Sequence, residues 1–589
     1  MAASDRVDRR AFLRLVPLGG VGLGTCLLGA CQPAPTAPSP TSAPAGSQST
    51  SPSGESRASN SAVQPTAAAP TAAGYPVSLL DTFSPKPDLP STGTWIDSAY
   101  LNYPPNPPKS STEAPGRGGS MTYFTQAVYP PATPLENNPS WQEANRQLNT
   151  EVHMNFATPA DYSAKLAALM AGNDLPDMFA LWQGLGTAQR LSEFLQSQAA
   201  DLTPFLTGDA IRNYPNLALI PQYSWRNSGA VINGHVYLLP IQQYRVGPIM
   251  FNNSAIWDRE IGPNYAPQGA DDFKRILQQL TRPRENRWAI GGPPQQVTGI
   301  QFGFGPIAQL FGAPNGWQLT GDGKLLRDRE TEAYKSAVGY VRDLWAAGVY
   351  DPDQPTYNVV IARNNYLASK LVVVQESFGG GWTDLWLRGR SQNPPATFNF
   401  MVPFPAQAGV KPTHFMTAGF LLANGFKKAN TDHIDELLRI CNWLAAPFGT
   451  QEDLLVQYGL QGTDYNFDSA GNPVPTQVGP SNSLYVGWQF MSRHPWVLYY
   501  PGLPDFGRVN QQAQQSLLPL GAEDPTWGTF SQTYLAKGRS METAFGDGIN
   551  DIISGRRPMS DYDQLVIDWR TGGGDAIRKE YLDQLTSSH

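Results

Sequence analysis

The chain has 589 residues, of which 49 are Asp or Glu and 42 are Lys or Arg, so its formal net charge at pH 7 is −7. An acidic chain without a basic stripe lacks the charge pattern of a nucleic-acid-binding protein, and we exclude nucleic acid as a partner. Hydrophobic residues make up 41% of a chain too long for one hydrophobic core, which predicts a globular body of more than one domain.

The first thirty residues have the order of an export signal. Four arginines precede a weakly apolar, glycine-rich run over 15–30, which is shorter than the about 20 apolar residues that a bilayer-spanning helix needs. A positive start before a short apolar run is typical of a signal peptide, and the Arg9-Arg10 pair resembles a twin-arginine export signal. An amphipathic helix of the fold is the alternative. The long, ordered pattern favours a signal peptide over residues 1–30.

The end of this run predicts a lipid anchor. The sequence LGAC at 28–31 resembles the lipobox of bacterial lipoproteins, which implies cleavage before Cys31 and a diacylglyceryl group on its sulfur. Two acyl chains hold a protein on a membrane, where one alone is marginal. With Cys26 removed and Cys31 acylated, only Cys441 remains, so no intramolecular disulfide is possible. Cys441 lies on an apolar helical face, which favours a buried thiol over a catalytic nucleophile.

Two segments of unusual composition follow. Residues 32–74, directly after the acylated cysteine, are nearly all Ala, Pro, Ser, Thr, Gly and Gln. Such a segment buries too little apolar surface to fold, so 31–74 is expected to be a lipidated cysteine with a disordered linker. A flexible coil of this length reaches about 35–40 Å. Residues 75–118 remain proline-rich but contain Tyr and Trp, and we expect an extended arm that packs on the body.

Strand and helix patterns alternate from the start of the body near residue 119. The expected elements are strands over 120–128, 151–157 and 174–182 and helices over 138–150 and 158–172. Later patterns predict a helix over 330–348, a helix end and strand over 364–377, a strand and helix over 419–446, and two helices separated by glycines over 563–585. Alternating strands and helices predict an α/β body with a parallel sheet covered by helices.

Several segments together resemble a known family. They are DYSAKLAALMAGNDLPDMFAL at 161–181, GHVYLLPIQQYRVGPIMFNNSAIWDREIG at 234–262, LFGAPNGWQLTGDGKL at 310–325, YKSAVGYVRDLWAAGVYDPD at 334–353 and DELLRICNWLAAPFGTQEDLLVQYGLQGTDYNF at 435–467. From about residue 119 to the end, the chain resembles the family 1 extracellular solute-binding proteins of ABC importers, in particular their large lipoprotein subgroup. Each segment is degenerate, and it is their order and spacing that make the resemblance specific.

The resemblance implies a two-lobed, periplasmic-binding-protein-like α/β fold with a ligand cleft between the lobes. The first lobe is expected to hold residues 119–240 with a later return from about 425–589, and the second to hold 250–410. Crossings between the lobes are expected near 240–250 and 410–425, with a third further on.

Motifs for catalysis, metals or cofactors are missing from the sequence. The six histidines are spread singly, and there is no H-E-x-x-H pair, G-x-S-x-G elbow or P-loop. The stretches DSAGN at 468–472 and TGDGK at 320–324 are similar to fragments of calcium loops but lack the other ligands, so hairpin turns are favoured. We expect no catalytic residues, no metal and no cofactor.

Aromatic residues provide the positive signal for a ligand. The chain has 15 Trp, 24 Tyr and 25 Phe, and sugar rings bind between aromatic faces and planar polar groups. The alternative for any single aromatic residue is a place in the core. Ligands of open α/β sheets bind beyond the carboxyl ends of strands. This position selects Thr125, Gln126, Trp182, Gln183, Tyr244, Arg245, Glu376, Trp382 and Asp384, and the family segment adds Trp317.

The acidic candidates and the glycines beside them have ordinary interpretations as well. The stretch ESFGGGWTD over 376–384 follows an apolar strand, and its glycines would allow close approach of a ligand to the backbone. The alternative is a flexible turn. Glu376 and Asp384 would accept hydrogen bonds from sugar hydroxyls, and the alternative is a solvated acid or a helix cap.

The resemblance implies a lipid-anchored receptor that captures a carbohydrate, expected to be an oligosaccharide, and delivers it to the permease subunits of an ABC importer. We expect an exported monomer, held by its lipid on the outer face of the bacterial cytoplasmic membrane, and no enzymatic activity. The alternative class is a lipid-anchored glycoside hydrolase, which would need two carboxylates about 5–10 Å apart. A peptide or a polyamine is an alternative ligand.

Overall fold

The computed structural model describes residues 75–78, 85–93, 95–172, 174–182, 190–263, 265–391 and 398–587. The predicted signal peptide over 1–30, Cys31 and the linker to residue 74 lie outside the described residues, as does Gln183. Within the described residues, no helix combines the length and the apolar character needed to cross a bilayer.

The first lobe is built on a five-stranded sheet in the order β2-β1-β3-β14-β6. Its strands are β1 (Ser120–Gln126), β2 (Glu151–Ala157), β3 (Met178–Trp182), β6 (Leu238–Gln242) and β14 (Phe420–Phe426). β1 runs parallel to β2 and β3, whereas β14 is antiparallel to both β3 and β6. The helices of this lobe are α1 (Pro139–Leu148), α2 (Tyr162–Gly172), α3 (Leu191–Gln198), α4 (Thr203–Leu206), α5 (Gln222–Asn227), α12 (Thr431–Leu444), α13 (Gln451–Tyr458), α14 (Gly479–Asn482) and α15 (Trp488–Met491).

Local chemistry explains why these helices begin and end where they do. At α1, the Asn138 side chain accepts a hydrogen bond from the Trp141 amide, Pro139 occupies the first turn, and Asn149 ends the helix in the left-handed region at φ 51°. At α12, Asn430 caps the helix in the same way. The apolar face of α12 packs into the first core, where Cys441 is buried as a free thiol.

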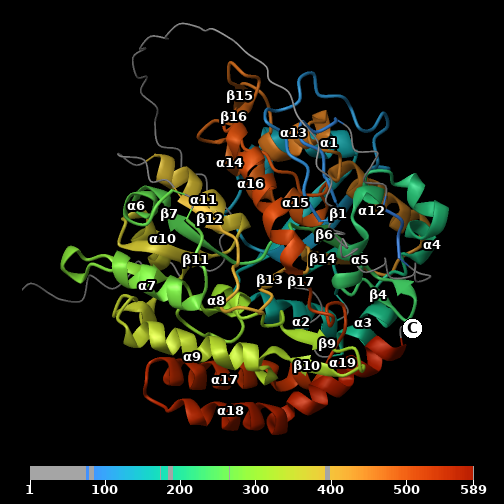
Figure 1. The fold of residues 1–589 in the computed structure, drawn as a ribbon. Helices are drawn as coiled ribbons and strands as arrows, with labels where there is room; N and C mark the ends of the chain where they lie inside the picture. Colours follow the sequence, from blue (N-terminus) through green and yellow to red (C-terminus); the bar gives the residue numbers. More distant parts are fainter. Residues whose placement is uncertain are drawn as a thin grey trace, which may run out of the picture.

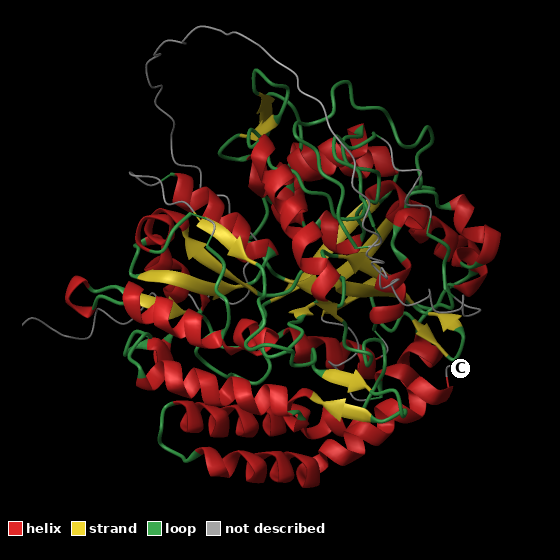
Figure 2. Ribbon diagram, in the orientation of Figure 1, coloured by secondary structure: helices red, strands yellow, loops and turns green. Residues whose placement is uncertain are grey.

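The second lobe is built on a four-stranded sheet in the order β12-β7-β11-β8. Its strands are β7 (Ile249–Asn253), β8 (Trp288–Gly291), β11 (Leu371–Glu376) and β12 (Phe398–Met401). β11 is parallel to β8, and β7 is antiparallel to β11 and β12. Its helices are α6 (Ser254–Glu260), α7 (Ala270–Leu280), α8 (Phe304–Leu310), α9 (Glu332–Ala346), α10 (Val359–Leu367), α11 (Gly379–Arg390) and α16 (Pro504–Leu517). Together the two lobes form the α/β fold predicted from the sequence (Figure 2). β1, β2 and β3 are parallel as expected, whereas β14 and β7 run antiparallel to their neighbours, so both sheets are mixed.

The last helices pack on the second lobe, not the first. α17 (Arg539–Ile553) lies against α9, and α18 (Tyr562–Trp569) lies against α17 (Figure 1). α19 (Asp575–Ser587) follows after a break in which Gly573 has φ 151°. Phe545 and Ile549 belong to the core of the second sheet. The apolar periodicity shows that these helices bury a face but does not specify which sheet they cover. The expected return of 425–589 to the first lobe is therefore wrong for the helices from α17 onward.

Short hairpins complete the two lobes. They are β4 (Val231–Ile232) with β5 (His235–Val236), β9 (Trp317–Leu319) with β10 (Leu325–Arg327), and β15 (Tyr465–Phe467) with β16 (Pro473–Pro475). The stretches 320–324 and 468–472 are the turns of the second and third hairpins, as their sequences predict. At the third, the Asp468 carboxylate accepts hydrogen bonds from the amides of Ala470 and Asn472, so the turn itself satisfies this acid.

The chain forms a small hinge where it passes between the sheets. Residues 243–248 join β6 to β7, and residues 402–419 lead from β12 back to β14. Within the second stretch, β13 (His414–Phe415) pairs in parallel with β17 (Gly521–Ala522). Val246 forms an antiparallel bridge with Met416. Three segments distant in sequence therefore share backbone hydrogen bonds at the hinge.

The proline-rich arm packs on the body. Leu89 bridges Ala99, which in turn bridges Leu498. Tyr100 and Tyr103 pack with Phe448 in a separate small cluster, with ring centroids 4.6 Å and 5.1 Å from it. The arm is therefore attached by backbone bridges together with the aromatic contacts of Tyr100 and Tyr103.

Candidate ligand-binding site

The ends of the strands in the two sheets face the junction between the lobes. In the first sheet, Trp182 ends β3 and Gln242 ends β6, and both lie beside the start of β14. In the second sheet, Glu376 ends β11 opposite Ile249, which begins β7. Residues 243–248 are all that separate β6 from β7, so the two edges are close in space. This junction is where an open α/β architecture binds ligands.

Thr125 and Trp182 come together at this edge. The Trp182 indole Nε1 donates a hydrogen bond to the Thr125 hydroxyl over 3.0 Å, and the Trp182 ring lies 5.2 Å from Phe490. Both residues are buried, and Gln126, the next residue of β1, is partly exposed. Thr125 and Trp182 therefore support the junction from beneath, and Gln126 lies nearer to solvent.

Tyr244 extends from the first crossing to the second lobe. Its ring packs edge-on against Trp496 at 5.6 Å and Phe378 at 6.3 Å. Burial raises the pKa of its hydroxyl to about 12, although hydrogen bonds from the backbone of Gly380 and Gly379 act in the opposite direction. The hydroxyl is therefore held at the N-terminus of α11.

The structure corrects the expectation of a glycine loop after β11. Gly379 is the first residue of α11, and Gly381 lies in its first turn. A Cβ at Gly379 would lie 2.2 Å from the Tyr244 ring, and one at Gly381 would lie 2.1 Å from Glu376 Cγ. These glycines allow close approach of protein side chains. The sequence pattern is right about close packing but does not identify what is packed.

Glu376 and Asp384 share one arginine. Arg363 Nε donates to Glu376 Oε2 over 2.8 Å, and Arg363 Nη1 lies 3.6 Å from Asp384 Oδ2. Asp384 also pairs with Arg388 at 3.1 Å, and the Ser377 amide donates to Glu376. Both carboxylates are therefore neutralised by nearby arginines, which is a structural arrangement and differs from the acid and base pair of a hydrolase.

Arg245 is fully buried at the hinge. Its guanidinium pairs with Glu523 and donates to the Thr417 carbonyl over 2.5 Å. Three aromatic rings surround it, with centroids 4.9 to 5.8 Å from the guanidinium carbon: Tyr223, Trp527 and Trp95. We call these six residues the hinge cluster. Burial lowers the pKa of Arg245, and Glu523 raises it.

A second group at the junction was not selected from the sequence. Gln242 accepts a hydrogen bond from the Trp496 amide at its side-chain oxygen and one from Arg493 Nη2 at its carbonyl, both over 2.5 Å. The Arg493 guanidinium carbon lies 5.1 Å from the Trp496 ring centroid. Both side chains are partly exposed. They come from residues 492–496, an irregular proline-containing stretch after α15, and such loops often carry function.

Aromatic rings continue this group on the first lobe. Tyr129 follows β1, and its ring stacks on Tyr485 at 5.5 Å and on Phe490 at 5.9 Å. Tyr129 and Tyr244 are the titratable neighbours that influence the pKa of Arg493. We define the junction cluster as Tyr129, Gln242, Tyr244, Tyr485, Phe490, Arg493 and Trp496. The Gln242 amide is buried and already hydrogen-bonded to Tyr223, Gln243 and Trp496, so it holds the cluster together. The partly exposed rings beside the Arg493 guanidinium are groups that a sugar ligand requires.

Two relatives known by sequence match most of the chain, whereas no family model matches it. Lipoprotein LipO of Bacillus subtilis is 20% identical over 478 residues, which cover 78% of this chain and 90% of LipO. The polygalacturonan/rhamnogalacturonan-binding protein YtcQ of the same organism is 20% identical over 458 residues, covering 75% of this chain and 86% of YtcQ.

Solved structures decide the fold. An HMO-binding, ABC-transporter-associated solute-binding protein from Bifidobacterium longum infantis superposes with a TM-score of 0.59 at 14% identity, covering 80% of this chain and 98% of its own. This chain has the solute-binding-protein fold. The alginate-binding protein AlgQ2 matches with a TM-score of 0.56 at 13% identity over 81% of this chain and 99% of its own. The S. pneumoniae substrate-binding protein FusA, in complex with kestose, superposes with a TM-score of 0.55 at 16% identity. The match covers 80% of this chain and 100% of its own.

Within this solute-binding-protein fold, two of the predicted tryptophans are core residues. Trp317 is buried in the hairpin of β9 and β10, with Trp569 and Tyr581 at 5.9 Å and 5.8 Å. It lies on the side of the second lobe that the C-terminal helices cover. Trp382 is a buried residue of α11, and its ring lies 5.3 Å from that of Phe251 in β7. Their burial is the core alternative that composition leaves open for any aromatic residue.

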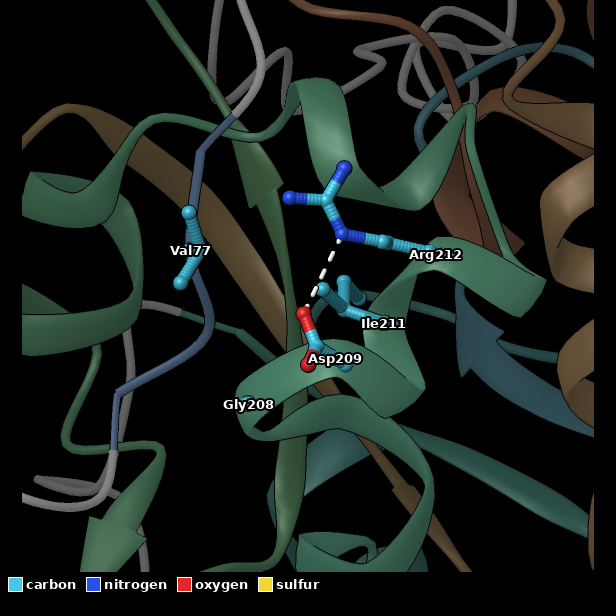
Figure 3. Close-up of a pocket in the computed structure, with 5 residues that line it drawn as sticks. All are labelled: Val77, Gly208, Asp209, Ile211 and Arg212. Atoms are coloured by element: carbon cyan, nitrogen blue, oxygen red, sulfur yellow. Dashed lines mark hydrogen bonds and ion pairs between the residues drawn. The ribbon is translucent and has the colours of Figure 1, made fainter.

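A surface hollow of the solute-binding-protein fold lies elsewhere on the first lobe. It has a volume of about 180 Å³ and is lined by Val77, Gly208, Asp209, Ile211 and Arg212 (Figure 3). An ion pair of 3.3 Å joins Arg212 to Asp209. The hollow contains none of the residues predicted from strand ends. Nor does any group of three His, Cys, Asp or Glu in the described part of the chain have a metal-binding arrangement.

Proposed function

We propose that this protein is an extracellular solute-binding protein that captures a carbohydrate at the junction cluster and passes it to the membrane subunits of an ABC importer. The observation that supports this most strongly is the set of partly exposed aromatic rings beside a guanidinium at the meeting edges of a solute-binding-protein fold. The known proteins of similar fold are described as binding HMO, alginate and kestose. YtcQ is named as a polygalacturonan/rhamnogalacturonan-binding protein.

Binding without chemistry is sufficient for this function. Ligand contacts with both lobes would favour a closed form by rotation at the hinge, to the extent that the ligand binds this form more tightly than the open one. The carboxylates at the junction that the sequence selects, Glu376 and Asp384, are held by Arg363. We therefore propose a binding protein that is not an enzyme and that works as a monomer.

Lipid anchoring is part of the proposal. It is supported by the LGAC sequence at 28–31, by the linker composition that follows, and by the similarity to a lipoprotein of Bacillus subtilis. The proposed location is the outer face of the cytoplasmic membrane, reached through a twin-arginine signal. Cells that express the full chain should incorporate a labelled fatty acid into it. The Cys31→Ser variant should remain unlabelled, and labelling of that variant would contradict the assignment of Cys31.

Titration with oligosaccharides tests the central proposal. The intrinsic tryptophan fluorescence of the purified protein should change saturably with at least one neutral or acidic oligosaccharide, because Trp496 lies in the junction cluster. Chromatography of the same mixtures should show no shortened products. A glycan panel without any saturable response would contradict carbohydrate capture. Product formation would instead establish the hydrolase alternative.

A further inference from the structure

Arg493 lies at the junction, and its side chain makes one hydrogen bond with the described residues. A guanidinium has five N–H donors. Nη2 donates to the Gln242 carbonyl, whereas Nε is buried and makes no hydrogen bond with the described residues. The plane of the group is kept in place by the Trp496 ring, 5.1 Å away. The arginine is thus positioned by an uncharged oxygen and an aromatic face.

An acidic partner is also missing. Among the described residues, no carboxylate lies within 4.0 Å of the Arg493 nitrogens. The arginines in comparable positions all have one. Arg245 pairs with Glu523, Arg329 pairs with Glu542 at 2.5 Å, and Arg363 pairs with Glu376 at 2.8 Å. Proteins rarely leave a guanidinium that is largely withdrawn from water without an anion, because the lost hydration is not replaced.

Burial of the Arg493 guanidinium without a nearby anion also affects its pKa. Burial lowers the pKa of Arg493 to about 10, and its neighbours Tyr129 and Tyr244 raise it only in part. Tyrosines are neutral at physiological pH, so they provide no counter-charge. An anion that arrives with a ligand would supply the missing interaction, and strongly perturbed groups of this kind concentrate at functional sites.

The chemistry of the surroundings indicates which anion. One guanidinium matches the single charge and planar shape of a carboxylate, with which it forms paired hydrogen bonds. Phosphate and sulfate groups carry more acceptor oxygens than this one arginine serves. The rings of Trp496, Tyr129 and Tyr485 offer flat apolar faces for a pyranose ring. We propose that Arg493 binds the carboxylate of a uronic acid, so that the ligand is an acidic oligosaccharide. This inference rests on the proposed function as a carbohydrate-binding protein.

Calorimetric titration of the full chain with matched sugars tests the proposal. The probes are trigalacturonate, its methyl ester, neutral galactotriose and a sulfated galactose trisaccharide. We expect the wild type to bind trigalacturonate at least tenfold more tightly than the methyl ester. Arg493→Met should lose this preference through weaker binding of the acid, at least tenfold, while binding of the ester stays within a factor of three. Arg493→Lys should recover part of the preference, because lysine restores the positive charge but cannot form the paired hydrogen bonds of a guanidinium.

A control variant tests whether the effect is specific to the arginine at the junction. It removes a different arginine that also lies over a tryptophan ring. Arg390 lies 5.8 Å above Trp386 and is exposed on α11. Arg390→Met should leave all four affinities unchanged. Circular dichroism and thermal unfolding should confirm that each variant is folded.

The outcomes distinguish failure of this inference from failure of the proposed function. No binding of any of these sugars or of a wider glycan panel contradicts the function itself. Equal binding of acid, ester and neutral sugar supports the function and overturns the role of Arg493. A preference for the acid that survives in Arg493→Met overturns the assignment of Arg493. Tightest binding of the sulfated sugar overturns the carboxylate as the anion.

Discussion

The hinge cluster and the junction cluster are built from the same kinds of side chains but leave different interactions unfilled. Each holds an arginine against a tryptophan and a backbone carbonyl. Arg245 also has Glu523 and two further rings, and it is fully buried. Arg493 has no such carboxylate among the described residues, and it remains partly exposed. Nε of both arginines is buried without a hydrogen bond, so the difference lies in the acidic partner. An arginine paired with a carboxylate stabilises the structure, whereas one without a carboxylate can receive an anionic ligand.

The largest expected effect is a loss of stability when the hinge cluster is disrupted. Arg245→Met should lower the free energy of unfolding by about 3 kcal/mol or more, because it removes a buried charge pair, a hydrogen bond to Thr417 and three ring contacts. Chemical denaturation measures this change. Arg226 approaches the same Glu523 at 3.4 Å but is exposed, so Arg226→Met should cost less than about 1 kcal/mol. Equal losses in the two variants would mean that burial of the pair adds nothing.

The next effect concerns the arm beside the hinge cluster. Asp97 is buried, its amide donates to Gln514 Oε1 over 2.7 Å, and Gln514 Nε2 donates to its carboxyl over 2.8 Å. Burial raises its pKa to about 7. The folded protein therefore holds this proton between pH 4 and 7 while the unfolded chain has lost it, and stability falls as the pH rises through this range. At about 1.4 kcal/mol per pKa unit, the full loss is at most about 4 kcal/mol.

Asp97→Asn isolates this contribution, because an amide can keep the hydrogen bond from Gln514 without the charge. Stability measured from pH 4 to 8 should decline less steeply in the variant than in the wild type. Burial also raises the pKa of Asp524 to about 6, so part of the decline should remain in both proteins. Identical pH profiles would show that Asp97 does not titrate in this range.

A smaller effect tests the contact between the first crossing and α11. Gly379→Ala would place a methyl group 2.2 Å from the Tyr244 ring, so we expect a loss of about 1–3 kcal/mol and weaker ligand binding. Gly339 lies in α9 with open space around it. Gly339→Ala should therefore stabilise the protein by up to about 1 kcal/mol, through helix propensity. A neutral Gly379→Ala would mean that Tyr244 moves aside without cost.

The smallest expected effect sharpens the comparison most. Arg493→Met should change the free energy of unfolding by less than about 1 kcal/mol, or raise it, because the removed charge has no acidic partner in the described part of the chain. Thermal unfolding beside Arg245→Met gives the contrast directly. A loss as large as that of Arg245→Met would show that Arg493 is a structural residue.

Regular elements of this fold are predictable from sequence because their signals are local. Alternation in 151–157 and the cap and apolar spacing around 139–148 depend on neighbours within a few residues, and β2 and α1 form where these signals lie. The sheet that a helix covers is not local information. The amphipathic pattern of 562–569 specifies a buried face, and only the structure shows that α18 covers α17 of the second lobe.

The site is less predictable, for the same reason. Strand ends select Arg245 from the sequence, but the acid that neutralises it is more than 250 residues away, at Glu523. Arg493 has no strand before it and lies in an irregular stretch, so no periodic signal selects it. Its distinguishing feature is the lack of an acidic partner among the residues that the structure describes, and this becomes visible only when the surrounding chain is in place.

The backbone hydrogen bonds between the hinge segments also limit how the two lobes can move. Met416 donates to Ala522 over 3.1 Å and Thr417 donates to Arg245 over 2.9 Å, so the connecting segments are cross-linked and cannot lengthen independently. The lobes are therefore expected to move by rigid-body rotation about the hinge, without a change in the length of the connecting segments. Groups next to the pivot travel little and groups at the rim travel far. We therefore expect residues at the hinge side of the junction to change position less on closure than residues at its rim.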